Sequence, residues 1–144
     1  MAIDGGGGGG GLLGVSNSFT GPAEALEVIG DHAYAFSGVT GATNAQVDRL
    51  SFTSGNYYFV GRLTCNGSVD VTGLGNGNVT GWIVSFNGAE VARILTDTAA
   101  AYIFNVAYNN IIIPPYTEVK VASISDGNDA TRQTSCSLTG RIYR

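Results

Sequence analysis

The chain has 144 residues, a length that fits one domain with a sizeable hydrophobic core. Hydrophobic residues make up 44 % of it and charged residues only 12 %, about half the charged share of an average soluble domain. The net charge is −4 and the basic residues form no cluster, so we expect no nucleic-acid partner. No stretch reaches the roughly 18 apolar residues of a membrane span, and the start lacks the features of a signal peptide. We therefore expect no membrane partner and a cytoplasmic place of assembly.

Residues 1–21 differ from the rest of the chain because they contain seven consecutive glycines, from Gly5 to Gly11. Ordering glycine costs more backbone entropy than ordering any other residue, so this run resists folding by itself. We predict an extended N-terminal arm over residues 1–21 and a folded domain over residues 22–144. Glycines 5, 7 and 10 match the G-x-G-x-x-G spacing, but a dinucleotide site needs a strand before them and a helix after them, so we expect no cofactor.

The folded domain begins with short segments typical of β-strands. Over residues 20–30, TGPAEALEVIG, we favour a turn followed by a strand, although Pro22 and Glu24 would also suit the first turn of a helix. Residues 32–38, HAYAFSG, alternate larger and smaller side chains with the period of two that a strand requires. His32 is the only histidine and lies on an aromatic strand face, where we interpret it as a structural residue rather than a catalytic base.

Residues 56–65, NYYFVGRLTC, and the short run SVDV at residues 68–71 are the next predicted strands. Cys65 lies on the apolar series of the first one, and Cys136 lies on the apolar series of a strand near the C-terminus. Two cysteines are too few for a disulfide framework. We interpret both as buried thiols that act as small hydrophobic residues, with a cross-strand disulfide as the alternative.

The clearest hairpin lies in residues 80–96, TGWIVSFNGAEVARILT. Asn87-Gly88 separates two alternating runs and suits a type I′ turn, whose two central residues need positive φ. Further strands are predicted over residues 101–108, 117–125 and 132–143. The first of these places four large side chains on one face: Tyr102, Phe104, Val106 and Tyr108. Other turn signals are Asn66-Gly67, Asn76-Gly77 and Asp126-Gly127.

This succession of strands predicts an all-β fold, an antiparallel β-sandwich or jelly roll of about eight strands with an extended Gly-rich N-terminal arm. Residues 111–115, IIIPP, cannot occupy a central ladder position because the two prolines lack backbone donors. We interpret them as the buried end of a strand. The alternative is a lip against which a neighbouring subunit packs.

Few residues could carry chemistry. No nucleophile, base and orienting group stand out together, so we expect neither a catalytic site nor an enzyme. Asp126, Asn128 and Asp129 could offer oxygen ligands to calcium, but this stretch lacks the length and terminal glutamate of an EF-hand. We therefore favour an ordinary turn there and expect no metal. Asn66 and Asn78 begin glycosylation sequons, which we interpret as turns because no secretory signal accompanies them.

Three segments carry a resemblance to a known group of proteins: ALEVIGDHAYAFSG at residues 25–38, IIIPPYTEVKV at residues 111–121 and SLTGRIYR at residues 137–144. The chain resembles the small jelly-roll proteins that decorate or cement the capsids of tailed bacteriophages, over residues 22–144. The resemblance implies a non-enzymatic component of the virion, assembled in the host cytoplasm. It also implies a homotrimer that binds the major capsid protein or other virion subunits, and it supplies no functional residues.

In that setting the glycine run has a physical use. An arm without side chains can lie in a narrow groove of a neighbouring subunit, with apolar residues as anchors at its ends. A passive linker is the competing interpretation. The hypothetical assembly contacts are Ile3, Gly7, Gly8, Gly9, Gly10, Leu12 and Leu13 in the arm, and Ile113, Pro114 and Pro115 in the lip.

A fibre tip or lectin-like module that binds a host glycan is the alternative function. Six aromatic residues would suit stacking on sugar rings if they gathered on the outside: Tyr57, Tyr58, Tyr102, Tyr108, Tyr116 and Trp82. Their positions on alternating strand faces favour the core instead. The number of copies per virion separates the two functions, since cement proteins are far more numerous than fibre tips.

Overall fold

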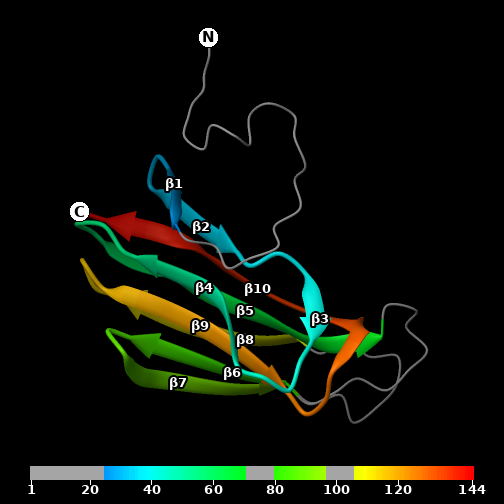
Figure 1. Ribbon diagram of the computed structural model, residues 1–144. Coiled ribbons are helices and arrows are strands. Elements are labelled where there is room, and N and C mark those ends of the chain that lie inside the picture. The colour runs from blue at the N-terminus through cyan, green and yellow to red at the C-terminus, as the bar shows by residue number, and fades with distance from the viewer. Residues whose placement is uncertain (1–24, 71–79, 97–105) are drawn as a thin grey trace.

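The computed structural model of the chain describes residues 25–70, 80–96 and 106–144. These residues form ten β-strands and no helix, which confirms the all-β prediction (Figure 1). In chain order the strands are β1 (Glu27–Ile29), β2 (His32–Phe36), β3 (Thr40–Ala42), β4 (Val47–Thr53), β5 (Tyr58–Asp70), β6 (Thr80–Phe86), β7 (Ala89–Thr96), β8 (Val106–Ile113), β9 (Glu118–Ser125) and β10 (Asp129–Tyr143). The arm predicted over residues 1–21 lies outside the described residues, as do Asn76-Gly77, Asn78, Tyr102 and Phe104.

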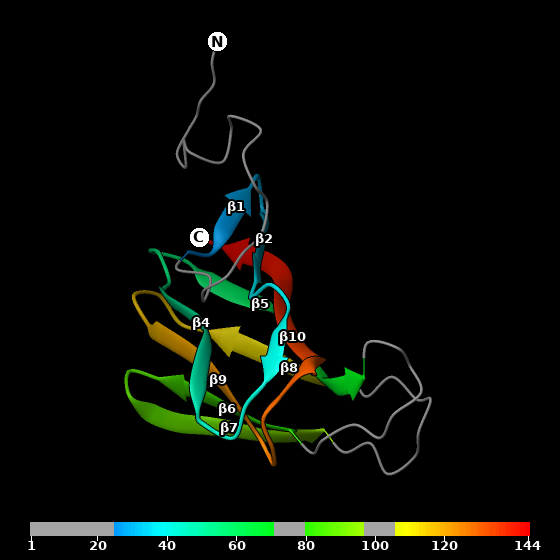
Figure 2. The ribbon, with the colours of Figure 1, turned by 45° about the vertical axis from the view of Figure 1, so that its right-hand side comes forward.

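The strands form two antiparallel sheets that pack face to face, so the predicted β-sandwich is confirmed (Figure 2). Sheet B has six strands in the order β1-β2-β10-β5-β8, with β3 also paired to β10. Sheet A has four strands in the order β4-β9-β6-β7. Side chains from the two inner faces fill the space between the sheets. The largest fully buried side chains are Trp82, Phe59, Leu50, Leu63 and Ile113.

β10 is the central strand of sheet B. It pairs with β5 along one side and with β2 and then β3 along the other. Between β2 and β3, Ser37 continues the pairing: its N–H donates to the Cys136 carbonyl oxygen (3.0 Å), and the Cys136 N–H donates to Ser37 Oγ (2.8 Å). Gly38 follows at a φ of 73°, which suits a residue without Cβ, and the chain then enters β3.

Two strands, β3 and β4, are absent from the sequence-based prediction. In β4, Arg49 and Leu50 are neighbours and both are buried, and the pairing with β9 shifts between Asp48 and Leu50. This bulge breaks the period-two pattern by which a strand is recognised. The predicted turn at Asn66-Gly67 is wrong. Both residues lie inside the long strand β5, which also contains residues 68–70 of the strand predicted separately over residues 68–71.

The predicted hairpin at Asn87-Gly88 is confirmed. Asn87 has a φ of 49° and Gly88 a φ of 83°, the positive values that a type I′ turn requires. The Asn87 side chain adds a tie to sheet A, because its Oδ1 accepts the N–H of Glu118 (2.9 Å). A register shift beside Val84 and Ser85 places Val91 on the exposed side of β7.

Three further local predictions, at β1, at Asp126-Gly127 and in the IIIPP segment, are also confirmed. β1 confirms the strand expected at the end of residues 20–30. Asp126-Gly127 lies between β9 and β10, as predicted. In the IIIPP segment, Ile111 and Ile113 are buried at the end of β8, which confirms the buried strand end.

Candidate interaction surface

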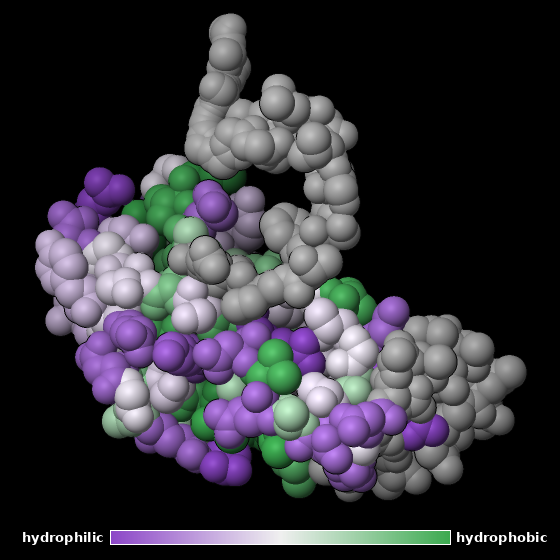
Figure 3. All heavy atoms as spheres, in the orientation of Figure 1, coloured by the Kyte–Doolittle hydropathy of each residue, from purple (hydrophilic) through white to green (hydrophobic). Residues whose placement is uncertain are grey.

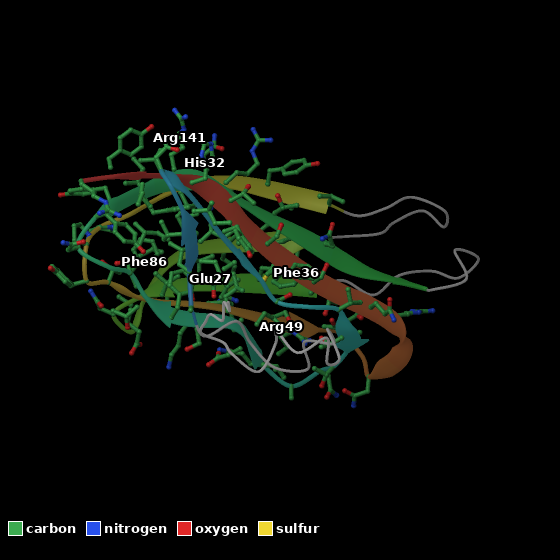
Figure 4. The ribbon with its side chains drawn as sticks, turned by 90° about the horizontal axis from the view of Figure 1, so that it is seen from above. Glu27, His32, Phe36, Arg49, Phe86 and Arg141 are labelled. Atoms are coloured by element: carbon green, nitrogen blue, oxygen red, sulfur yellow. The ribbon has the colours of Figure 1, made fainter. Side chains whose placement is uncertain are left out.

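The outer face of sheet B points away from sheet A and carries the candidate site. Strand register places alternate residues of five strands side by side on this face. One cross-strand row consists of Ile29, His32, Arg141, Val60 and Ile112. The next row consists of Glu27, Tyr34, Thr139, Arg62 and Asn110. Figure 4 shows His32 and Arg141 projecting from sheet B on the side away from sheet A.

The outer face is unusually apolar for a sheet surface. Eight of its large apolar or aromatic side chains are between 40 % and 70 % exposed: Ile29, Tyr34, Phe36, Tyr58, Val60, Tyr108, Ile112 and Tyr143. The inward residues of β2, Ala33 and Ala35, are small and buried. A sheet with one face in solvent usually shows the opposite pattern, with polar residues outside. In Figure 3 the front of the molecule, over β4 and β9, is mostly hydrophilic, while hydrophobic side chains gather over β1 and β2.

Two shallow hollows lie on the outer face, and Thr139 lines both. The first, of about 460 Å³, is lined by Ile29, His32, Tyr34 and Arg141 together with the neighbouring backbone. The second, of about 540 Å³, is lined by Val60, Arg62, Asn110 and Ile112. Each hollow therefore combines apolar walls with hydrogen-bonding side chains, the composition that ligand pockets share.

Several ionisable groups on or beside this face contact one another or an aromatic ring. Asp31 contacts both His32 Nδ1 (2.7 Å) and a guanidinium nitrogen of Arg141 (3.2 Å). The Arg62 guanidinium carbon lies 5.2 Å from the centroid of the Tyr108 ring, within the range of a cation–π contact. The His32 side chain is 66 % exposed, so this surface pairing, and not burial, is what holds it.

The aromatic residues divide differently from the sequence-based expectation that most belong to the core. Trp82 is fully buried, and Tyr57 packs partly buried against the core. Tyr58, Tyr108 and Tyr116 are more than half exposed, which corrects that expectation for all three. The alternation along a strand shows that the strand has two faces, but it does not show which of them the second sheet covers.

Within the proposed lip at residues 113–115, Ile113 is fully buried in the core of the single chain, whereas Pro114 is exposed. The turn itself is held firmly. The Ser54 hydroxyl donates to the Pro114 carbonyl oxygen (2.7 Å) and accepts the N–H of Thr117 (2.8 Å).

A buried cation ties three strands together away from the outer face. Arg49, only 5 % exposed, donates from Nε to Ser123 Oγ (2.7 Å) and from a terminal nitrogen to Thr40 Oγ1, and it reaches the Gly41 carbonyl oxygen. Loss of hydration on burial lowers the pKa of this guanidinium from its ordinary value. Arg49 thus joins β4 to β9 and β3, and its hydrogen-bonding partners are neutral groups.

The two cysteines are free, buried thiols, as predicted. Burial is the main cause of the raised pKa of the Cys136 thiol, which is about 12, and burial also raises the pKa of the Cys65 thiol. A thiol of this kind is a poor nucleophile at neutral pH.

The turn that offered oxygen ligands serves a structural contact: Asn128 Oδ1 accepts the N–H of Asn44 (2.8 Å) and so links the β9–β10 turn to the β3–β4 loop. Within the part of the chain that the structure describes, no three His, Cys, Asp or Glu side chains gather as metal ligands would. In the same residues no helix has the length and hydropathy to cross a membrane. No protein-family model matches the chain, and neither does any curated protein.

Proposed function

We propose that the protein is a non-enzymatic structural subunit of a virion, one that decorates or cements a capsid through its β-sandwich and N-terminal arm, and whose copies associate through the outer face of sheet B. The single observation that carries the proposal is the apolar, aromatic character of this face. The resemblance of three sequence segments to phage decoration proteins supplies the setting. The N-terminal arm would add contacts of its own to neighbouring subunits.

The size of the outer face fits a protein–protein interface. The ladders that join the five strands hold between three and eleven residue pairs each. With strands about 4.8 Å apart and about 3.4 Å per residue, the face spans roughly 440 Å². Each partner of a standard interface buries about 800 Å², so the face would supply about half of that area and neighbouring side chains the rest. Apolar patches larger than a few hundred Å² are rare on soluble monomers and mark interaction sites. We therefore propose that copies of the chain associate as a homotrimer and that the assembly seats on the major capsid protein or other virion subunits.

The oligomeric state tests the first half of this proposal. Ile112 and Leu95 are both at least 60 % exposed on edge strands, Ile112 on the outer face of sheet B and Leu95 on β7 of sheet A. We expect the unaltered chain and Leu95→Lys to sediment as trimers at micromolar concentration, and Ile112→Lys to sediment as a monomer with an unchanged melting temperature. A monomeric unaltered chain, or identical behaviour of the two variants, would contradict the use of this face.

Copy number tests the virion setting. Quantitative mass spectrometry of purified particles should find the chain in numbers comparable to those of the shell subunits. Particle binding should fall for Ile112→Lys and also after removal of residues 1–21, while Leu95→Lys binds like the unaltered chain. A few copies per particle would instead indicate a fibre position.

A glycan-binding module is the second candidate, and the two hollows beside Thr139 favour it. Tyr34 and Tyr108 are exposed for stacking on sugar rings, and Asn110, Thr139 and Arg141 offer hydrogen bonds. Under this candidate function, Tyr34→Ala and Tyr108→Ala would each abolish retention on immobilised host polysaccharide while leaving the oligomeric state intact. Loss of the trimer without any glycan retention by the unaltered chain would favour the structural role.

A further inference from the structure

Cys65 and Cys136 form a directly opposed pair at the centre of sheet B. Cys65 lies on β5 and Cys136 on β10, and the register of the two strands places them opposite each other. Both side chains point into the core and are fully buried. They are separated by 70 intervening residues in sequence, so a covalent bond between them would join distant parts of the chain.

The backbone hydrogen bonds show which kind of pair this is. The N–H and C=O of Cys136 both bond to Ser37, on the side of β10 away from β5. Six residues later, the Ile142 N–H likewise turns away from β5 and donates to the Asp31 carbonyl oxygen (2.9 Å). Alternate residues of an antiparallel strand share this orientation. Cys65 and Cys136 are therefore a non-hydrogen-bonded pair.

Non-hydrogen-bonded pairs bring two strands closest together. Their Cα atoms are about 4.5 Å apart, against about 5.5 Å in hydrogen-bonded pairs. Disulfides span Cα separations of about 4.4 to 6.8 Å, so this pair falls at the short end of the allowed range. Gly61 and Gly140 form a pair of the same kind four residues away, and a Cβ built on Gly140 would lie 2.5 Å from the Gly61 Cα. The close approach of β5 and β10 thus extends along this part of the ladder.

We propose that Cys65 and Cys136 are a modification site that closes to an intramolecular cross-strand disulfide when a disulfide oxidant such as oxidised glutathione is present. The thiolate of one cysteine attacks a glutathione sulfur, the glutathione S–S bond breaks, and one glutathione thiolate leaves. The second cysteine then attacks the protein sulfur of the mixed disulfide and releases the second glutathione thiolate. Two protein thiols are oxidised and one glutathione disulfide is reduced to two glutathione thiolates, which take up the two protons that the protein thiols release and become glutathione.

Burial controls when this step can occur. With both sulfurs inside the core, oxidised glutathione reaches them only when β10 separates from β5, during folding or local opening. Once closed, the bond would lock the two longest strands of sheet B together and oppose that same opening. Its place at the short end of the range implies strain, so reductants should reopen it more readily than an unstrained structural disulfide.

The experiment uses the full chain in glutathione buffers of graded oxidation, with enough urea to allow local opening and, in parallel, during refolding from denaturant. Intact-mass analysis after alkylation under denaturing conditions should show a monomeric product about 2 Da lighter that takes up no alkylating agent. The melting temperature should rise by about 5 °C or more and return on reduction. Cys65→Ala and Cys136→Ala serve as matched controls and should show neither change.

The contrary outcome is equally clear. If both cysteines remain alkylatable after refolding in oxidised glutathione, the pair does not close and the proposal is wrong. The same conclusion follows if the only products are mixed disulfides with glutathione or disulfide-linked dimers. The oligomer and particle-binding tests of the outer face are independent of this result, because Cys65 and Cys136 lie on the inner face of sheet B.

Discussion

Gly61 on β5 and Gly140 on β10 face each other so closely that neither strand has room for a side chain there. A Cβ on Gly61 would lie 2.2 Å from the Thr139 carbonyl oxygen, and one on Gly140 would lie 2.3 Å from the Val60 carbonyl oxygen. The tip of the Phe59 ring lies within 3 Å of both hypothetical Cβ positions. Phe59 therefore fills the space that the glycine pair leaves in the core.

This pair gives the first prediction. Gly140→Ala should lower the free energy of unfolding by about 2–4 kcal/mol, because overpacking here displaces backbone and not a flexible side chain. Gly81→Ala is the matched control, since the nearest atom to its added methyl group lies 3.7 Å away. Urea unfolding should show a large loss for Gly140→Ala and no loss for Gly81→Ala. Equal stability of the two variants would mean that β5 and β10 are further apart than described.

The hairpin gives the second prediction. Asn87→Val should destabilise the fold by about 1–2 kcal/mol, because a β-branched residue is disfavoured at positive φ and the bond from the Glu118 N–H to Oδ1 is lost. Asn87→Gly keeps the backbone freedom and loses only that hydrogen bond. Its thermal shift should therefore be clearly smaller, and identical shifts would place the whole cost on the side-chain bond.

Buried Arg49 gives the third prediction. Arg49→Lys keeps a cation in a desolvated place but replaces three directed donors with one ammonium, so we expect a loss of about 2–3 kcal/mol. Arg49→Met removes the charge and leaves hydroxyls that can find other partners, so its loss should be smaller. Denaturant midpoints of the two variants provide the comparison. A more stable lysine variant would indicate that the site is wetter than its 5 % exposure suggests.

The thiols give the fourth prediction, on pH. An unfolded cysteine has a pKa of about 8.5, whereas burial raises the pKa of Cys136 to about 12 in the folded chain. The unfolded state therefore loses its thiol proton first, and stability present below about pH 8.5 declines as the pH rises toward 12, by up to about 1.4 kcal/mol per pH unit for each thiol. Under reducing conditions, the alkaline slope of the unfolding free energy should be shallower in Cys136→Ala. Parallel slopes would show that other groups cause the decline.

Local features of this fold can be predicted from the sequence, whereas the pairing of segments that are distant in sequence cannot. The Asn87-Gly88 turn depends on two adjacent residues, so their chemistry suffices to predict it. The alternation of Tyr34 with Ala33 and Ala35 reveals two faces of β2, but which face is buried depends on sheet A and cannot follow from the period alone. For the same reason the sequence does not predict the contacts of Arg49, whose partners Thr40 and Ser123 lie on other strands. It also does not predict the register that places Cys65 opposite Cys136.

The central place of β10 has a consequence for how the chain folds. The β1–β2 hairpin on one side and the β5–β8 pair on the other are joined into one sheet only through β10, the last of the ten strands in sequence (Figure 1). During synthesis, sheet B therefore cannot assemble until every other described strand has left the ribosome, and its contacts have high sequence separation. Such topologies fold in milliseconds to seconds and not in microseconds. In that interval the unpaired edges of β2 and β5 are open to other chains, so a partner that captures the nascent protein, such as a second copy, would meet it at the edges that β10 later fills.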